Sequence, residues 1–369
     1  MGQPLSNLSV SGFKSIRHLK DFELGKLNLL VGANGAGKSN FITFFRMLRA
    51  MSEEGLVNFV TENGGADGFF FGGPKETPEI EAYLKFGRNE YRFALAPTAS
   101  MKLMVKREST LYTARGDWEH HAGGGTESLL KQWKGKSSKW GPYPGPESYV
   151  YEAVSSWLVY HFHDTSTTAG MRRDHSVRNW RELHPDAVNI APFLLRLKTK
   201  HPEYFEKIRE TVQIIAPFFD DFLLEPEDQG GNEVIRLEWN QKGSSYPFQP
   251  WQLSDGTIRF ICLATALLQP SPPSTIVIDE PELGLHPFAL DVLAGVMRDA
   301  AERTQLIVST QSATLLNHFE PEEVIVVDRD AGASRFRRLD SASLAEWLKD
   351  FALGELWQKN VFDGGPAHE

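Results

Sequence analysis

A glycine-rich loop near the start of the chain constrains its fold more than any other feature of the sequence. The loop Gly32-Ala33-Asn34-Gly35-Ala36-Gly37-Lys38-Ser39 follows the apolar run 27–31 and precedes apolar residues at helical spacing. In this order of strand, loop and helix, backbone N–H groups curl around phosphates, and the helix N-terminus adds its positive dipole end. We therefore expect a P-loop on an α/β sheet, in which Lys38 reaches the β- and γ-phosphates and Ser39 coordinates Mg²⁺.

A second apolar run ends in two carboxylates. Asp279 and Glu280 directly follow the run 275–278. Two unpaired acids at the end of a buried strand are poor structural residues, because burying charge without a partner is costly. We expect Asp279 to hold Mg²⁺ through water, and Glu280 to orient and deprotonate the attacking water. The loop and the two acids together predict ATP hydrolysis, with ATP and Mg²⁺ as the cofactors.

The C-terminal part of the chain alternates strands and helices. Three segments have apolar residues at helical spacing, and three short apolar runs have the length of strands. These expected helices and strands alternate along the chain. The expected helices are 257–268, 287–303 and 313–318, and the expected strands are 275–278, 306–309 and 324–327. Such alternation implies a parallel sheet covered on both faces.

The middle of the chain follows other patterns. From about residue 79, near-alternation of apolar and polar residues predicts an antiparallel hairpin, with 101–107 as a third strand. Residues 115–146 are rich in Gly, Ser, Pro and Lys and predict a long loop. We expect an ATP-binding core with an antiparallel β subdomain, and an inserted lobe with a helical segment. The expected bounds are 1–100 and 245–369 for the core, 101–244 for the lobe and 189–216 for its helical segment.

Composition limits the cell compartment and the class of protein. The chain has 369 residues, of which 41% are hydrophobic, and its net charge of −9 argues against a protein that coats nucleic acid uniformly. No apolar run approaches the roughly 20 residues that cross a bilayer, and the N-terminus lacks the pattern of a signal peptide. We therefore expect a cytoplasmic protein without a membrane partner. Its single cysteine, Cys262, lies in an apolar run and is expected to be a small core residue.

Two further motifs have weaker signals when taken alone. Leu253-Ser254-Asp255-Gly256-Thr257 stands about 22 residues before Asp279 and opens a helix, so by itself it reads as a helix cap. Gln311 follows the strand 306–309, about thirty residues after the two carboxylates. Its neutral amide can bind a phosphate oxygen or water but cannot titrate near pH 7.

Together these motifs resemble the RecF/SMC/OLD-type AAA family of ABC-like ATPases. The resemblance covers nearly the whole chain. It is carried by Gly12-Phe13-Lys14-Ser15-Ile16, by the loop as far as Asn40, by His163-Asp164-Thr165-Ser166, by residues 279–287 and by Leu353-Gly354-Glu355-Leu356-Trp357. The segment 253–257 then corresponds to the ABC signature loop, usually Leu-Ser-Gly-Gly-Gln, with Asp255 and Thr257 as departures. Gln311 replaces the histidine that most relatives use to contact the γ-phosphate.

The resemblance implies an ATP-dependent homodimer. In this family the signature loop binds the γ-phosphate held by the other protomer, which assigns Ser254 and Gly256 to the nucleotide site together with Gly32, Asn34–Asn40, Gln311 and the two acids. Relatives act in DNA repair, chromosome organisation and anti-phage defence. This chain has neither coiled-coil arms nor room for a nuclease domain, so we expect a separate, nuclease-like effector protein, with DNA as an optional partner.

Other functions stay open at this point. An ABC transporter nucleotide-binding subunit would need a permease, and a non-hydrolysing scaffold would use ATP only to join two subunits. The segment 131–140 mixes lysines with tryptophans, as single-strand binders do, but solvated loops have the same composition. Arg172 and Arg173 could supply a cation to the nucleotide or to DNA, or form a surface ion-pair cluster.

Overall fold

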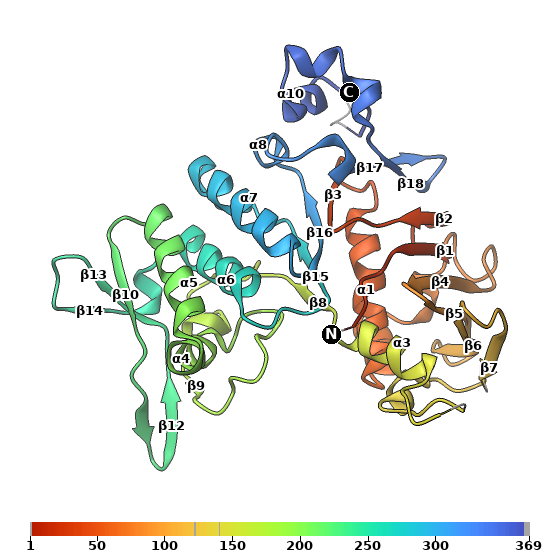
Figure 1. Ribbon diagram of the computed structural model, residues 1–369, viewed down its shortest axis with the longest axis horizontal. Coiled ribbons are helices and arrows are strands. Elements are labelled where there is room, and N and C mark those ends of the chain that lie inside the picture. Colours follow the sequence, from red (N-terminus) through yellow and green to blue (C-terminus); the bar gives the residue numbers. More distant parts are fainter. Residues whose placement is uncertain (1, 122, 140, 365–369) are drawn as a thin grey trace.

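The computed structural model describes residues 2–121, 123–139 and 141–364, and its two largest sheets face each other across helix α1 (Figure 1). The first sheet has the order β18-β17-β3-β16-β15-β8, in which the five consecutive strands from β17 to β8 are parallel and β18 is antiparallel. The second sheet is antiparallel and has the order β2-β1-β4-β5-β6-β7. The expected α/β class with a mainly parallel sheet and an antiparallel subdomain is confirmed.

The strands have the following bounds. The first sheet consists of β3 (Leu27–Val31), β8 (Leu158–Tyr160), β15 (Thr275–Asp279), β16 (Gln305–Thr310), β17 (Val324–Asp330) and β18 (Ala333–Arg338). The second sheet consists of β1 (Asn7–Phe13), β2 (Ile16–Glu23), β4 (Ile80–Phe86), β5 (Asn89–Pro97), β6 (Leu103–Tyr112) and β7 (Trp118–His121). There are also two small sheets of three strands each. One consists of β10 (Phe219–Leu223), β13 (Glu238–Gln241) and β14 (Pro247–Phe248). The other consists of β9 (His175–Ser176), β11 (Glu227–Gln229) and β12 (Asn232–Ile235).

The described residues form ten α-helices, of which α1, α5, α6 and α7 are the longest. They are α1 (Lys38–Ser52), α2 (Leu56–Glu62), α3 (Pro146–Ser155), α4 (Ile190–Lys200), α5 (Pro202–Ile215), α6 (Asp255–Leu268), α7 (Pro287–Ala301), α8 (Ala313–Leu316), α9 (Ser341–Leu344) and α10 (Leu353–Gln358). The helical segment expected at 189–216 is divided into α4 and α5, because Pro202 begins a new helix at its first position. No helix of the described residues is long and apolar enough to cross a membrane.

Alternate residues of the parallel strands face two separate cores. Leu30, Val277 and Ile307 point to a core shared with α1 and the antiparallel sheet. Their neighbours Leu29 and Ile278 point to the opposite core, which α4 to α8 cover. The parallel sheet is therefore buried on both faces, as the apolar runs predict.

Residues 101–244, expected as an inserted lobe, are divided among several layers. Strands β6 and β7 extend the antiparallel sheet, and β8 pairs with β15 at the edge of the parallel sheet. The loop expected at 115–146 contains β7 and the short 3₁₀ helix Leu130–Trp133. The helices α4 and α5 pack beside α6 and α7 in Figure 1, and the division into core and lobe stays a prediction.

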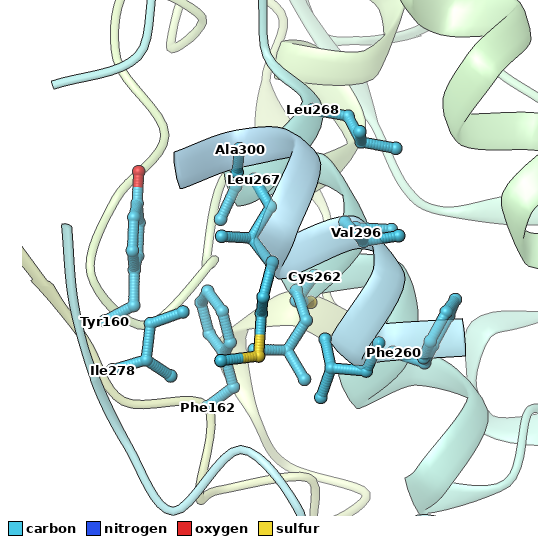
Figure 2. Close-up of a cluster of buried hydrophobic side chains, with 14 of the residues drawn as sticks. Tyr160, Phe162, Phe260, Cys262, Leu267, Leu268, Ile278, Val296 and Ala300 are labelled. Carbon is cyan, nitrogen blue, oxygen red and sulfur yellow. The ribbon is translucent and has the colours of Figure 1, made fainter. Parts of the chain in front are cut away.

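Cys262 is a buried core residue, as its sequence context indicates. It lies on α6 among apolar side chains that include Phe162, Phe260 and Ile278 (Figure 2). Burial raises the pKa of the Cys262 thiol to about 12. The thiol is therefore protonated near neutral pH and acts as a packing group.

Candidate functional site

Three neighbouring strands deliver the predicted site residues to one edge of the parallel sheet. Asp279, at the end of β15, pairs in register with Ser309 of β16, and Thr310 of β16 pairs with Val31 of β3. The glycine loop leaves β3 directly after Val31. Because these strands are parallel, their carboxyl ends meet at the same edge, where ligands of open α/β sheets bind.

The loop's backbone requires glycine at two positions. Gly37 precedes α1 with a φ of 119°, and a Cβ atom there would lie 1.9 Å from Ser334 Oγ. Gly35 has a φ of 77° with no atom within 4 Å of its Cβ position. L-residues with a side chain rarely adopt such conformations, so both glycines are set by the curl of the loop.

A hydroxyl cluster supports the outer side of the loop. Ser334 Oγ on β18 donates to Ser15 Oγ at 2.7 Å, and it also contacts Ala36 O. Asn40 Nδ2 on α1 donates to the same Ser15 Oγ at 2.7 Å. The loop is therefore fixed by the turn after β1 and by β18, which lie at opposite ends of the sequence. Ser15 belongs to a motif quoted above, whereas Ser334 has no sequence signal.

Lys38 lies inside the curl of the loop. Only 6% of the residue is exposed, and Nζ donates to Gly32 O at 2.6 Å and to Ala33 O at 3.2 Å. Burial lowers the pKa of Lys38, while the charges of Glu280, Asp279 and Glu282 act in the opposite direction. The ammonium group thus experiences the field of all three carboxylates at the ends of the strands.

Asp279, the predicted metal residue, and Glu280, the predicted catalytic base, have different surroundings. Asp279 Oδ1 accepts a hydrogen bond from Ser309 Oγ, and Asp279 O accepts one of 3.0 Å from His163 Nε2. Glu280 has a φ of 46°, an uncommon conformation for a residue with a side chain. Its N–H donates to Ser309 O at 3.0 Å, which holds this backbone in place. Strained backbone of this kind concentrates at functional sites.

Gln311 contacts the carboxylates of Glu280 and Glu282. Its Nε2 donates to Glu280 Oε1, and its backbone N–H donates to Glu282 Oε1 at 2.6 Å. Burial raises the pKa of Glu282, and within the described residues Glu282 Oε2 has no hydrogen-bond partner. Glu282 is a residue that the sequence reasoning left without a role, although it stands in the same motif as Glu280.

The segment 253–257, expected as a signature loop, leads into helix α6. Ser254 caps α6, and its Oγ accepts from Thr257 N at 3.1 Å. A Cβ atom on Gly256 would lie 2.4 Å from Gly284 O, so this glycine permits close packing against the segment after Glu280. Among the described residues, no hydrogen bond joins Ser254 or Gly256 to the loop 32–39. The structure therefore brings together the P-loop, the two acids and Gln311, whereas the contacts of Ser254 and Gly256 are with Thr257 and Gly284.

An open hollow adjoins the P-loop. It has a volume of about 530 Å³ and lies next to the hydroxyl cluster. Its lining includes Ser15 and Asn40, the aromatic ring of Phe71 and three cations, Lys14, Arg17 and Arg329. The size is within the range of small-molecule sites, and the lining offers both stacking and cationic groups.

The segment 131–140 takes part in the packing of the fold. Lys131 pairs with Glu54 at 3.1 Å and Lys136 with Glu147 at 2.8 Å, and Trp133 is 3% exposed. Trp140 lies outside the described residues. Trp133 thus packs in the core, whereas Lys131 and Lys136 pair with acids at the surface, so both interpretations of this segment stay open.

The fold and the site define a P-loop ATPase whose core resembles the heads of SMC proteins. A search among solved structures supports this class. The Smc head bound to the C-winged helix domain of ScpA aligns over 93% of this chain and 99% of its own, with a TM-score of 0.61 and 15% identity. A head domain with an extended coiled coil, bound to the C-terminal domain of ScpA derived from Pyrococcus furiosus, aligns over 94% and 99%, with a TM-score of 0.52 and 15% identity.

A family model gives the closer assignment. Residues 27–317 match the family described as "AAA domain, putative AbiEii toxin, Type IV TA system". The chain belongs to this family of AAA-domain ATPases, and the resemblance inferred from its motifs is confirmed. No curated protein matches the chain in sequence.

Proposed function

We propose that this protein binds ATP with Mg²⁺ and hydrolyses it in a site shared by two copies of the chain. Hydrolysis then opens an ATP-bound dimer that controls a separate effector, in DNA repair or anti-phage defence. The family description, which names a toxin–antitoxin setting, supports the second of these pathways. The fold shared with Smc heads supports a dimer switch.

The observation that carries this proposal is the meeting of one buried cation with three carboxylates at the edge of the sheet. Lys38 would stabilise the phosphates, for which a compact ammonium group is suited. Glu280 would accept the proton of the water that attacks the γ-phosphorus, as the bond to the β–γ bridging oxygen breaks and ADP leaves. Gln311 would hold the Glu280 carboxylate in place for this step.

The residues present fit a magnesium ion. Ser39 offers a hydroxyl oxygen at the start of α1. Asp279 offers a carboxylate, which already accepts a hydrogen bond from the hydroxyl of Ser309. Mg²⁺ prefers such oxygen ligands and is usually bound by one or two carboxylates, waters and substrate phosphates. When bound, it would supply positive charge that neutralises the phosphate oxygens.

The hollow beside the P-loop fits the rest of the nucleotide. Lys14, Arg17 and Arg329 line this hollow, and the Arg17 guanidinium lies over the Phe71 ring at 4.6 Å. These planar and cationic groups suit a nucleoside, whose base can stack and whose phosphates lead into the loop. We assign the adenosine part to this hollow.

Exposed apolar residues mark the surface where a second copy would bind. Trp251 is 55% exposed just before the signature loop, while Leu283 and Phe288, 40% and 51% exposed, flank the segment that packs on Gly256. Large apolar side chains that gather around a functional loop indicate an interface. A two-fold arrangement would place each signature loop against the partner's P-loop.

The proposal is tested by measuring the mass of the protein in solution with and without ATP. Light scattering of Glu280→Gln with ATP and Mg²⁺ should give about twice the monomer mass, because the bound nucleotide joins the two subunits and is not hydrolysed. The same variant without nucleotide is the control. A monomer at saturating ATP and micromolar protein would contradict the shared site.

Gln311→Ala should lower kcat by about 10²-fold with little change in ATP affinity. The alanine removes the amide that holds Glu280, a contact that matters most in the transition state. Steady-state hydrolysis from pH 6 to 9 measures the effect, and Gln311→His, which retains a donor, should keep part of the activity. An unchanged rate for Gln311→Ala would make Gln311 a structural residue.

A further inference from the structure

Arg172 is a buried arginine that contacts the signature loop. Only 5% of the residue is exposed, and it lies in a short 3₁₀ helix, Gly170–Arg172. Its Nη1 donates to Leu253 O at 3.1 Å and also to Pro250 O. Its Nη2 donates to Asp255 Oδ1 at 2.8 Å. Three of its acceptors thus belong to the signature loop or to the residues that immediately precede it.

The same guanidinium is anchored from the other side. Arg172 Nε donates to Thr165 O at 3.0 Å, within the segment that begins at His163. His163 Nε2 donates to Asp279 O at 3.0 Å. The segment 163–172 therefore contacts the end of β15 and the signature loop of the same chain.

A buried guanidinium is costly unless its donors are paired, and its planar fork fixes the relative positions of its acceptors. Here the fork spans two backbone carbonyls and one carboxylate that flank Ser254. Loops of this kind have several accessible backbone conformations, and a shared rigid donor selects one of them. Arg172 thereby fixes the direction in which the signature loop presents its hydroxyl and N–H groups.

This contact also accounts for a departure from the usual signature sequence. Asp255 stands where the resemblance places a glycine, and a glycine has no carboxylate for Arg172. The Asp255 side chain is 67% exposed, whereas that of Arg172 is 3% exposed, so the carboxylate reaches from the loop surface to the buried cation. The sequence suggested that Arg172 binds a nucleotide or DNA, or that it belongs to a surface ion-pair cluster. A buried arginine that contacts the signature loop fits neither role.

We propose that Arg172 is a positioning residue that holds the signature loop in the conformation that binds the nucleotide of a second copy of this chain. It acts on the partner's nucleotide through Pro250, Leu253 and Asp255 and contacts no nucleotide itself. The inference rests on the proposed composite site, which assigns the signature loop to the partner's γ-phosphate.

Arg172→Met, which keeps side-chain length but removes the donors, should lower kcat at least about tenfold. Its equilibrium affinity for ATP should stay within about twofold of the wild type, because the P-loop is unchanged. Arg172→Lys should restore only part of the rate, since an ammonium cannot reproduce the fork. Arg173→Met, at the exposed neighbouring position, is the matched control and should behave as the wild type.

Mixed dimers separate a role toward the partner from a role in the same subunit. An equal mixture of Arg172→Met and Lys38→Ala should hydrolyse ATP faster than either variant alone, at up to about a quarter of the wild-type rate, since a heterodimer has one intact site. A mixture of Ser254→Arg with Lys38→Ala tests the composite site itself. Recovery with Ser254→Arg but not with Arg172→Met overturns the positioning role, and no recovery in either mixture overturns the composite site and the inference with it.

Asp255→Asn tests the same contact if Arg172→Met does not fold. Asp255→Asn changes an exposed side chain and should lower kcat about threefold without changing ATP affinity. Combined with Arg172→Lys, its effect should be less than multiplicative, because both changes affect one contact. Multiplicative effects, or a change in ATP affinity instead of kcat, would overturn the proposal.

Discussion

Glu280→Gln should reduce ATP hydrolysis by about 10³-fold and leave the nucleotide tightly bound. The glutamine keeps the shape of the side chain, and its amide oxygen can still accept the hydrogen bond from Gln311 Nε2. What it loses is the ability to take a proton from the attacking water. The loss therefore falls on the chemical step, and the affinity for ATP should change little.

The measurement is single-turnover hydrolysis together with equilibrium ATP binding for the purified variant. Glu302→Gln is a matched control, because it makes the same change in a carboxylate that is 72% exposed and pairs only with the exposed Lys26 among the described residues. This control should hydrolyse ATP at the wild-type rate. Wild-type turnover in Glu280→Gln would remove Glu280 from the reaction. A wild-type protein that dimerises with ATP but shows no turnover would instead be the non-hydrolysing scaffold.

The position of the candidate site at one edge of the sheet could be predicted because its residues follow directly from strand patterns. The P-loop and the pair Asp279 and Glu280 each end an apolar run, and parallel strands place such ends together. The alternation of strands and helices along the chain is enough to relate the two motifs in space. Their roles in catalysis remain predictions that the variants test.

Other contacts could not be predicted, because they join distant parts of the sequence through single side chains. Ser334 and Ser15 are separated by more than three hundred residues, and neither position has a pattern that links it to the other. The same is true of Arg172, whose acceptors lie about eighty residues away. A pair of adjacent arginines indicates a charged surface by composition alone, and only the packing of the fold reveals that one of them is buried.

Strand β7 was missed for a different physical reason. Its sequence, Trp118-Glu119-His120-His121, lies among glycines and lysines that predict a loop. The strand pairs with β6. The Arg92 guanidinium lies 4.0 Å from the centre of the Trp118 ring, and the Tyr83 and Trp118 rings form an edge-type contact. Cross-strand packing of this kind overrides local propensity, since strand formation depends on neighbours that a short window of sequence does not contain.

Lys38→Ala should weaken ATP binding by about 10²-fold. Truncating one partner of a buried charge pair costs about 3 kcal/mol of binding free energy, which corresponds to this change in Kd. In the protein the ammonium already lies inside the loop, bonded to Gly32 O and Ala33 O, so little rearrangement is needed to reach the phosphates. Burial lowers the pKa of Lys38. A phosphate ligand would favour the charged form, and binding should weaken as the pH rises toward the pKa of this ammonium.

Isothermal titration with ATP and Mg²⁺ at pH 7 measures the loss, and Lys26→Ala is the matched control. Lys26 precedes the same strand at its other end, and its side chain is 68% exposed, so its removal should leave ATP affinity unchanged. Because dimerisation is proposed to require the bound nucleotide, Lys38→Ala should also remain monomeric at ATP concentrations that saturate the wild type. A variant that lost affinity yet dimerised with ATP would separate the two processes and exclude the nucleotide as the link between subunits. Unchanged affinity would place the phosphates outside the loop.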